Sequence, residues 1–233
     1  MKVNLKEAAL FARIAAAAYD VKLLPKDCEL LQTFEHKPTD TQAILVEFKG
    51  QRILAIRGTS NWQDCLTDLN VKLVQFGFGR AHQGFAEATK GLVRAMDGLD
   101  LTNITIVGHS LGGAIAALIS AITRAPAYTF GQPMVGDSAL AEGLGNVVCF
   151  VNEADGVPLL PCLPRYEHGG AHLHITAAHE VLINPSGWQE IQARALGLVN
   201  NLDATPDAIG DHYIAAYVEN LEKAAQLTTE IEL

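Results

Sequence analysis

Short runs of apolar, mostly β-branched residues alternate along the chain with longer segments in which apolar residues recur every three or four positions. The short runs predict strands, and they lie at 43–48, 52–57, 104–107, 128–130, 147–151 and 173–176. The longer segments predict helices, and they lie within the first 20 residues and at 111–122, 186–199 and 212–226. Strands that alternate with helices predict an α/β fold, with a mostly parallel sheet covered by helices on both faces.

Local signals support two of these elements. Asn4 followed by Glu7 is similar to a capping box, which favours a helix starting at that point. Gly50-Gln51 lies between two apolar runs and predicts a β-hairpin. The chain has 233 residues and shows neither a linker nor an internal repeat, so we predict one domain over 1–233.

The net charge and the length of the apolar stretches argue against some classes of binding partner. The formal net charge of −9 argues against nucleic-acid binding, which needs a basic surface to neutralise phosphates. No stretch reaches the roughly 20 apolar residues of a membrane span, and charged residues interrupt the N-terminal segment where a signal peptide would need an apolar core. The four cysteines form no CxxC pair. We therefore expect free thiols and either a cytoplasmic location or secretion without a cleaved signal peptide.

The strongest chemical signal is the pentapeptide Gly108-His109-Ser110-Leu111-Gly112, which fits the pattern GxSxG. It lies between a β-branched run and an Ala-rich helical segment, where a nucleophile elbow must lie. Such an elbow exposes the serine hydroxyl above the sheet, and the backbone N–H of Leu111 can donate to a developing oxyanion. Ser110 is therefore the predicted nucleophile of a serine hydrolase.

A serine hydroxyl needs a base to take its proton, and the base needs an acid that fixes its tautomer. In α/β-hydrolases these residues follow in the order serine, acid, histidine. Asp155 comes just after the predicted strand 147–151, with Asp137 as its rival. His212 lies in a loop that leads into the last predicted helix, and loops at that edge of a sheet carry function. Asp155 and His212 are our choices.

Four further histidines cluster between these two residues. His172 and His174 share one face of a predicted strand and have the spacing of metal ligands. No acidic or cysteine ligand shares that spacing, so we favour a packing role for this pair and for His168 and His179. We predict neither a metal nor an organic cofactor.

Taken together, six ordered motifs resemble the class 3 lipase family, which includes the triacylglycerol lipases of filamentous fungi. They span most of the chain. The motifs are Ala55-Ile56-Arg57-Gly58-Thr59, His82-Gln83-Gly84-Phe85, Gly108 to Gly113, Thr129-Phe130-Gly131-Gln132-Pro133, Asp155 with Val157-Pro158, and His212 with Tyr217. We expect neither the signal peptide nor the disulfides of the secreted fungal members, so the sequence resembles the bacterial members more.

This resemblance implies an α/β-hydrolase fold and a triad of Ser110, Asp155 and His212. It implies that Thr59 supplies the first oxyanion-hole donor and Leu111 the second. It also places a mobile lid at 60–67, where Trp62, Cys65 and Leu66 fall on one face of a short helix. The alternative is that this helix packs on the core and does not move.

We therefore expect a carboxylic ester hydrolase, most similar to a triacylglycerol lipase or carboxylesterase, with a lipid or ester substrate and transient contact with a lipid interface. Two alternatives stay open. One is a phospholipase A1 on the same scaffold, and the other is a hydrolase-fold binding module without catalytic activity.

Overall fold

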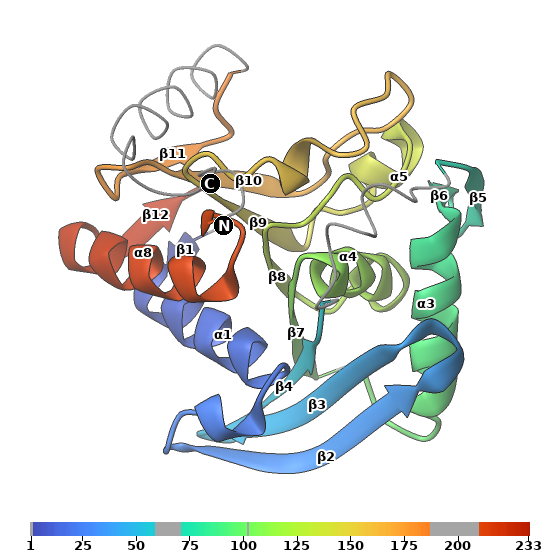
Figure 1. Ribbon diagram of the computed structural model, residues 1–233, viewed down its shortest axis with the longest axis horizontal. Coiled ribbons are helices and arrows are strands. Elements are labelled where there is room, and N and C mark those ends of the chain that lie inside the picture. The colour runs from blue at the N-terminus through green and yellow to red at the C-terminus, as the bar shows by residue number, and fades with distance from the viewer. Residues whose placement is uncertain (1, 59–70, 102, 187–209) are drawn as a thin grey trace.

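An eight-stranded sheet runs through the centre of the computed structural model, which describes residues 2–58, 71–101, 103–186 and 210–233 (Figure 1). The strand order is β11-β10-β9-β8-β7-β4-β3-β2. The central pairs from β4 through β10 are parallel, and the pairs at both edges are antiparallel. The mostly parallel α/β sheet is therefore confirmed. The strands are β2 (Cys28–His36), β3 (Thr41–Phe48), β4 (Gln51–Ile56), β7 (Ile104–His109), β8 (Ala127–Phe130), β9 (Val147–Asn152), β10 (Ala171–Ile175) and β11 (Val181–Ile183).

Helices cover both faces of this sheet, as predicted (Figure 1). The helices α1 (Leu5–Ala17) and α8 (Ile214–Leu227) pack together on one face. On the other face lie α3 (Gln83–Ala95) and α4 (Leu111–Thr123). The central strands are thus buried on both sides, which explains why they are continuous apolar runs.

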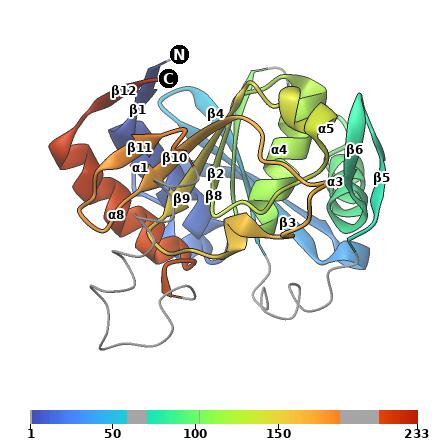
Figure 2. The same cartoon turned by 90° about the horizontal axis from the view of Figure 1, so that it is seen from above.

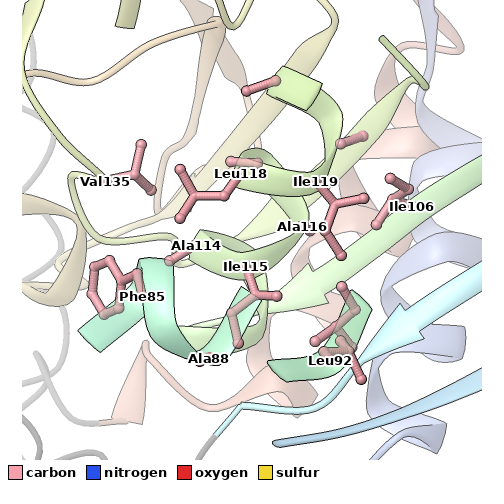
Figure 3. Packing of buried hydrophobic residues seen from close by; sticks show 14 of the residues in the cluster. Phe85, Ala88, Leu92, Ile106, Ala114, Ile115, Ala116, Leu118, Ile119 and Val135 are labelled. Carbon is pink, nitrogen blue, oxygen red and sulfur yellow. The ribbon is translucent and has the colours of Figure 1, made fainter. Parts of the chain in front are cut away.

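Strand β4 shows how successive residues serve the two faces. Leu54 and Ile56 belong to the core under α3 and α4, whereas Ile53 and Ala55 belong to the core under α1 and α8. Figure 3 shows the first of these cores, in which labelled side chains of α3, α4 and β7 interdigitate. Each fully buried Leu or Ile contributes roughly 1.5 to 3 kcal/mol to folding, so this core fixes where β7 and α4 meet.

The start of α1 has the predicted cap. The Asn4 side chain accepts hydrogen bonds from the backbone N–H groups of Lys6 and Glu7, at 2.9 and 3.1 Å. Just before this cap, β1 (Lys2–Asn4) pairs with β12 (Glu230–Glu232) in an antiparallel ribbon. Figure 2 shows the two ends of the chain side by side in this ribbon.

Several elements differ from the sequence-based prediction. Helix α3 and strand β2 were not predicted, and α8 begins at Ile214, so that His212 lies in the loop before it. The predicted helix 186–199 lies, apart from its first residue, outside the described residues. The remaining elements are η1 (Val21–Leu23), η2 (Lys37–Thr39), β5 (Leu73–Phe76), β6 (Gly79–His82), α5 (Ser138–Glu142) and η3 (Val157–Leu159).

Among the helices that the structure describes, none combines the length and the apolar character that a membrane crossing requires.

Candidate active site

Ser110 stands at a sharp turn between the end of β7 and the start of α4. Its backbone has φ 57° and ψ −125°, a conformation that costs a non-glycine residue about 1 to 3 kcal/mol. The turn depends on two glycines. A Cβ on Gly108 would lie 2.3 Å from the carbonyl oxygen of Gly112, and a Cβ on Gly112 would lie 2.2 Å from that of Ile56. The predicted nucleophile elbow is thus present in its geometry.

The structure brings Ser110, His212 and Asp155 into one buried hydrogen-bonded chain. Nε2 of His212 lies 2.9 Å from Oγ of Ser110, and Nδ1 lies 2.9 and 3.1 Å from the two carboxylate oxygens of Asp155. A carboxylate only accepts, so the proton of neutral His212 is on Nδ1 and Nε2 accepts from the serine hydroxyl. This is the arrangement that a serine nucleophile and its base require.

Asp155 is held by two further donors. The backbone N–H of Val157 donates to Oδ1 at 2.9 Å, and the hydroxyl of Tyr217 donates to Oδ2 at 2.6 Å. Burial and the neighbouring carboxylate raise the pKa of Tyr217 well above its usual value. The hydroxyl therefore stays protonated near neutral pH and donates to the carboxylate.

A polar network ties the loop of Asp155 to the loop of His212. Asn152 donates from its side chain to the carbonyl of Asp211 at 3.2 Å, and the Asp211 carboxylate accepts the N–H of Ala154 at 2.9 Å. Asn220 of α8 donates to the side chains of Asn152 and Glu153, at 2.7 and 3.0 Å. Sequence reasoning missed Asp211 and Asn220, because nothing local marks a residue whose partners lie 57 to 68 positions away.

The alternative acid, Asp137, lies at the start of another helix and has a different role. It caps the N-terminus of α5, where Oδ1 accepts the backbone N–H groups of Leu140 and Arg80, both at 3.0 Å. Its carboxylate thus caps the start of α5 and holds β6 through Arg80, and the acid that contacts His212 is Asp155.

The oxyanion donors are only partly described. Leu111 is the first residue of α4, so its backbone N–H has no acceptor within the helix and is available to a ligand. Gly58 passes close to the nucleophile, since a Cβ on it would lie 3.2 Å from Cβ of Ser110. Thr59 and the lid candidates Trp62, Cys65 and Leu66 lie outside the described residues, so their roles stay predictions.

Histidines of the 168–179 cluster make contacts within the loop and the strand that follow Asp155. The ring of His168 bonds through Nε2 to the carbonyl of Pro158 and lies 5.4 Å from the ring of His172. His174 is fully buried in β10. Within the parts of the chain that the structure describes, no three His, Cys, Asp or Glu side chains are grouped so that they could hold a metal ion.

The chain is similar to one known sequence family and to several individual proteins. The model of the family described as lipase (class 3) matches residues 53–164, which include Ser110 and Asp155. Toxin TseL of Vibrio cholerae is 35% identical over 112 residues, which are 41% of this chain and 18% of that protein. Secreted mono- and diacylglycerol lipase A of Penicillium cyclopium is 34% identical over 93 residues, 36% of this chain and 30% of that protein. The chain spans well under half the length of these curated relatives.

Solved structures resemble the chain over a longer range. The Rhizomucor miehei lipase propeptide complex has a TM-score of 0.65 at 25% identity, covering 76% of this chain and 70% of that one. Lip2 lipase from Yarrowia lipolytica has a TM-score of 0.72 at 20% identity, covering 89% and 91%. This likeness confirms the α/β-hydrolase fold. Whether the chain is a bacterial-type member stays a prediction. The match of residues 53–164, together with an elbow serine in contact with a histidine and an aspartate in the expected order, shows that this part of the chain is similar to the class 3 lipase family.

Proposed function

We propose that this chain is a serine ester hydrolase that acts on lipid-type carboxylic esters, acylglycerols above all, through an acyl-enzyme on Ser110. The observation that carries the proposal is the unbroken path of hydrogen bonds from Asp155 through His212 to Oγ of Ser110. All three side chains are buried, so their electrostatic interactions are not screened by bulk water.

The geometry supports a two-step acyl transfer. Nε2 of His212 takes the hydroxyl proton while Oγ of Ser110 attacks the ester carbonyl, and the charge on the carbonyl oxygen develops toward the N–H of Leu111. The protonated His212 then gives its proton to the leaving alcohol, and the acyl group stays on Oγ. In the second step His212 takes a proton from a water molecule as that water attacks the acyl carbonyl. The bond between the acyl carbon and Oγ then breaks, the carboxylic acid leaves, and His212 returns the proton to Oγ. Asp155 remains ionised and stabilises the charged imidazole.

The substrate class rests on the comparisons. The family is named for lipases, and the similar Penicillium protein is named as a mono- and diacylglycerol lipase. Acylglycerols offer the uncharged ester carbonyl that the mechanism needs. An acidic protein with a net charge of −9 also gains nothing from long-range attraction to anionic lipids.

The first test concerns the nucleophile. Ser110→Ala is expected to lower kcat on p-nitrophenyl butyrate by about 10⁴-fold or more and to abolish labelling by a fluorophosphonate probe, because the triad acts as a unit. Ser138→Ala, which changes an exposed serine at the start of α5, is the matched control and should label like the unchanged protein. Labelling of the Ser110→Ala variant, or an unchanged protein without turnover, would overturn the proposal.

The second test concerns the substrate. Rates are compared on mono-, di- and triacylglycerols of increasing acyl length and on phosphatidylcholine. The proposal expects kcat/KM to be higher on at least one class of acylglycerol than on the phospholipid. Preference for phosphatidylcholine would instead make the protein a phospholipase A1, and turnover of soluble esters alone would make it a plain esterase.

A further inference from the structure

A second chain of hydrogen bonds, partly buried at Tyr19 and buried at His109, lies next to Ser110, and the acyl-transfer steps do not use it. Its centre is His109, which is only 5% exposed. Nε2 of His109 lies 2.6 Å from the backbone carbonyl oxygen of His212, and Nδ1 lies 2.8 Å from the hydroxyl of Tyr19. The two histidine rings are neighbours, with their centroids 4.8 Å apart.

The direction of each bond in this chain follows from the chemistry of its ends. A carbonyl oxygen only accepts, so Nε2 of His109 carries a proton and donates to His212. Nδ1 is then the acceptor, and the Tyr19 hydroxyl donates to it. The same hydroxyl oxygen accepts a hydrogen bond from the backbone of Gly58. The path thus runs in one direction, from Gly58 through Tyr19 and His109 to His212.

This polarity requires a neutral His109. Burial, and to a smaller extent the neighbouring His212, lower its pKa to about 3. Burial also raises the pKa of Tyr19 well above its usual value, so its proton stays in place. Neither group changes charge near neutral pH, and His109 therefore adds no positive charge beside the imidazolium that forms on His212.

The path connects three segments that the reaction needs together. Gly58 directly precedes the predicted oxyanion donor Thr59, His109 directly precedes Ser110, and the last acceptor is the backbone of the base. The contacts leave no spare room, since a Cβ on Gly58 would lie 2.3 Å from the Tyr19 hydroxyl and 2.6 Å from the carbonyl oxygen of His109. Tyr19 itself comes from the loop after α1 and lies outside the residues 53–164 that match the family model.

We propose that Tyr19 and His109 are positioning residues for the ester hydrolysis, which hold the backbones of Gly58 and His212 in register with Ser110. This inference rests on the proposed function. His212 must stay within hydrogen-bond reach of Oγ while it gains and loses a proton, and a small displacement of such a group costs a large factor in rate. With its carbonyl held by His109, the His212 ring can move only through its own side-chain torsions.

Substitutions of His109 can separate this role from simple packing. His109→Gln keeps an N–H at the position of Nε2, whereas His109→Asn has its amide nitrogen only at the position of Nδ1 and cannot reach the His212 carbonyl. We expect His109→Gln to retain kcat within about 5-fold and His109→Asn to lose about 100-fold, with KM on a soluble short-chain ester changed less than 3-fold by either. Equal losses of kcat for the two variants would overturn the role of His109.

Tyr19→Phe tests the other half of the path, with Tyr128→Phe in β8 as the control for loss of a tyrosine hydroxyl. We expect Tyr19→Phe to lower kcat about 10-fold and Tyr128→Phe to leave it unchanged. If the two residues act as one chain, the double variant Tyr19→Phe/His109→Asn is no slower than His109→Asn alone. Multiplication of the two losses would mean that Tyr19 and His109 act independently.

These outcomes are distinct from failure of the proposed function. If the unchanged protein neither turns over esters nor reacts with the fluorophosphonate probe, the ester hydrolase is wrong. If it does both, and the Gln and Asn variants of His109 still match each other, only the positioning role is wrong. Thermal unfolding of each variant is measured alongside. A purely structural effect lowers Tm and the fraction of folded protein in both His109 variants. It does not make the kcat of His109→Asn lower than that of His109→Gln.

Discussion

An aspartate becomes the acid of a triad through its neighbours, and the two candidates of this chain differ in theirs. Asp155 accepts from a histidine ring, a tyrosine hydroxyl and one backbone N–H. Asp137 accepts from two backbone N–H groups at the start of a short helix. Both positions suit a carboxylate, but only the first sets the tautomer of a base. In the sequence Asp155 directly follows a predicted strand, whereas Asp137 lies further beyond the run at 128–130, so the local pattern favours Asp155 but does not show which carboxylate contacts the histidine.

Replacement by asparagine should expose this difference. In Asp155→Asn the amide can present an N–H to Nδ1 of His212, which favours the wrong tautomer, and kcat should fall by about 10³ to 10⁴-fold. In Asp137→Asn the remaining carbonyl oxygen can still accept from both N–H groups, so kcat should change less than about 3-fold and the free energy of unfolding by about 1 kcal/mol or less. Ester hydrolysis and urea unfolding of both variants check this. The reverse ranking would assign the acid to Asp137.

At the scale of elements, the central strands could be predicted because both faces of the sheet are covered, which makes them continuous apolar runs. Helix α3 could not. It begins at the ring of His82, which accepts the N–H of Phe85, and histidine is not a usual cap. Gly84 and Gly91 further lower its helix propensity. Strand β2 is an edge strand in which Phe34 alone is buried, so it lacks the alternation that marks a half-buried strand.

The active-site residues likewise fall into those that the sequence predicts and those that it does not. Ser110 follows from the GxSxG motif in its strand–helix context, and the chain order and the family resemblance add Asp155 and His212. His109 and Tyr19 could not be assigned roles, because their contacts join positions 90 and 103 residues apart. Hydrogen bonds of this kind exist only once α1, β7 and the loop before α8 have come together.

The strand–turn–helix element makes its own prediction. A Cβ in Gly108→Ala would meet the backbone of Gly112 at 2.3 Å and that of Gly113 at 2.8 Å, and backbone in a packed core cannot yield cheaply. We expect a loss of about 2 to 3 kcal/mol in the free energy of unfolding and a marked loss of probe labelling. Gly145→Ala has open space around its new Cβ and should change stability by less than about 0.5 kcal/mol. Urea unfolding compares the two, and equal stabilities would show that the elbow tolerates a side chain.

For the molecule as a whole, buried neutral histidines set a limit on acid stability. Burial lowers the pKa of His82 and lowers that of His109 to about 3, so both are uncharged in the folded protein near neutral pH. The unfolded chain binds protons at these residues once the pH falls below about 6.5. Below that pH the unfolded state therefore holds more protons than the folded state, and stability falls with falling pH until the folded pKa is reached.

His109 alone should account for about 1.4 kcal/mol of lost stability per pH unit within that window. Between pH 7 and pH 4.5 the free energy of unfolding of His109→Gln should thus fall by about 2 to 3 kcal/mol less than that of the unchanged protein. Urea unfolding at both pH values measures the difference. Parallel losses in the two proteins would mean that His109 is charged, or that it is not buried, in the folded state.

The ribbon of β1 and β12 and the packing of α8 on α1 also determine when the active site comes into being. Ser110 and His212 are 102 positions apart, and the loop that carries the base is held by the helix that docks against the N-terminal one. During synthesis the N-terminal part of a chain folds first. A chain that has emerged only through η3 can build its elbow and its acid but has no base. The proposed reactivity of Ser110 toward esters therefore begins only when α8 has reached its place, and an unfinished chain is inactive.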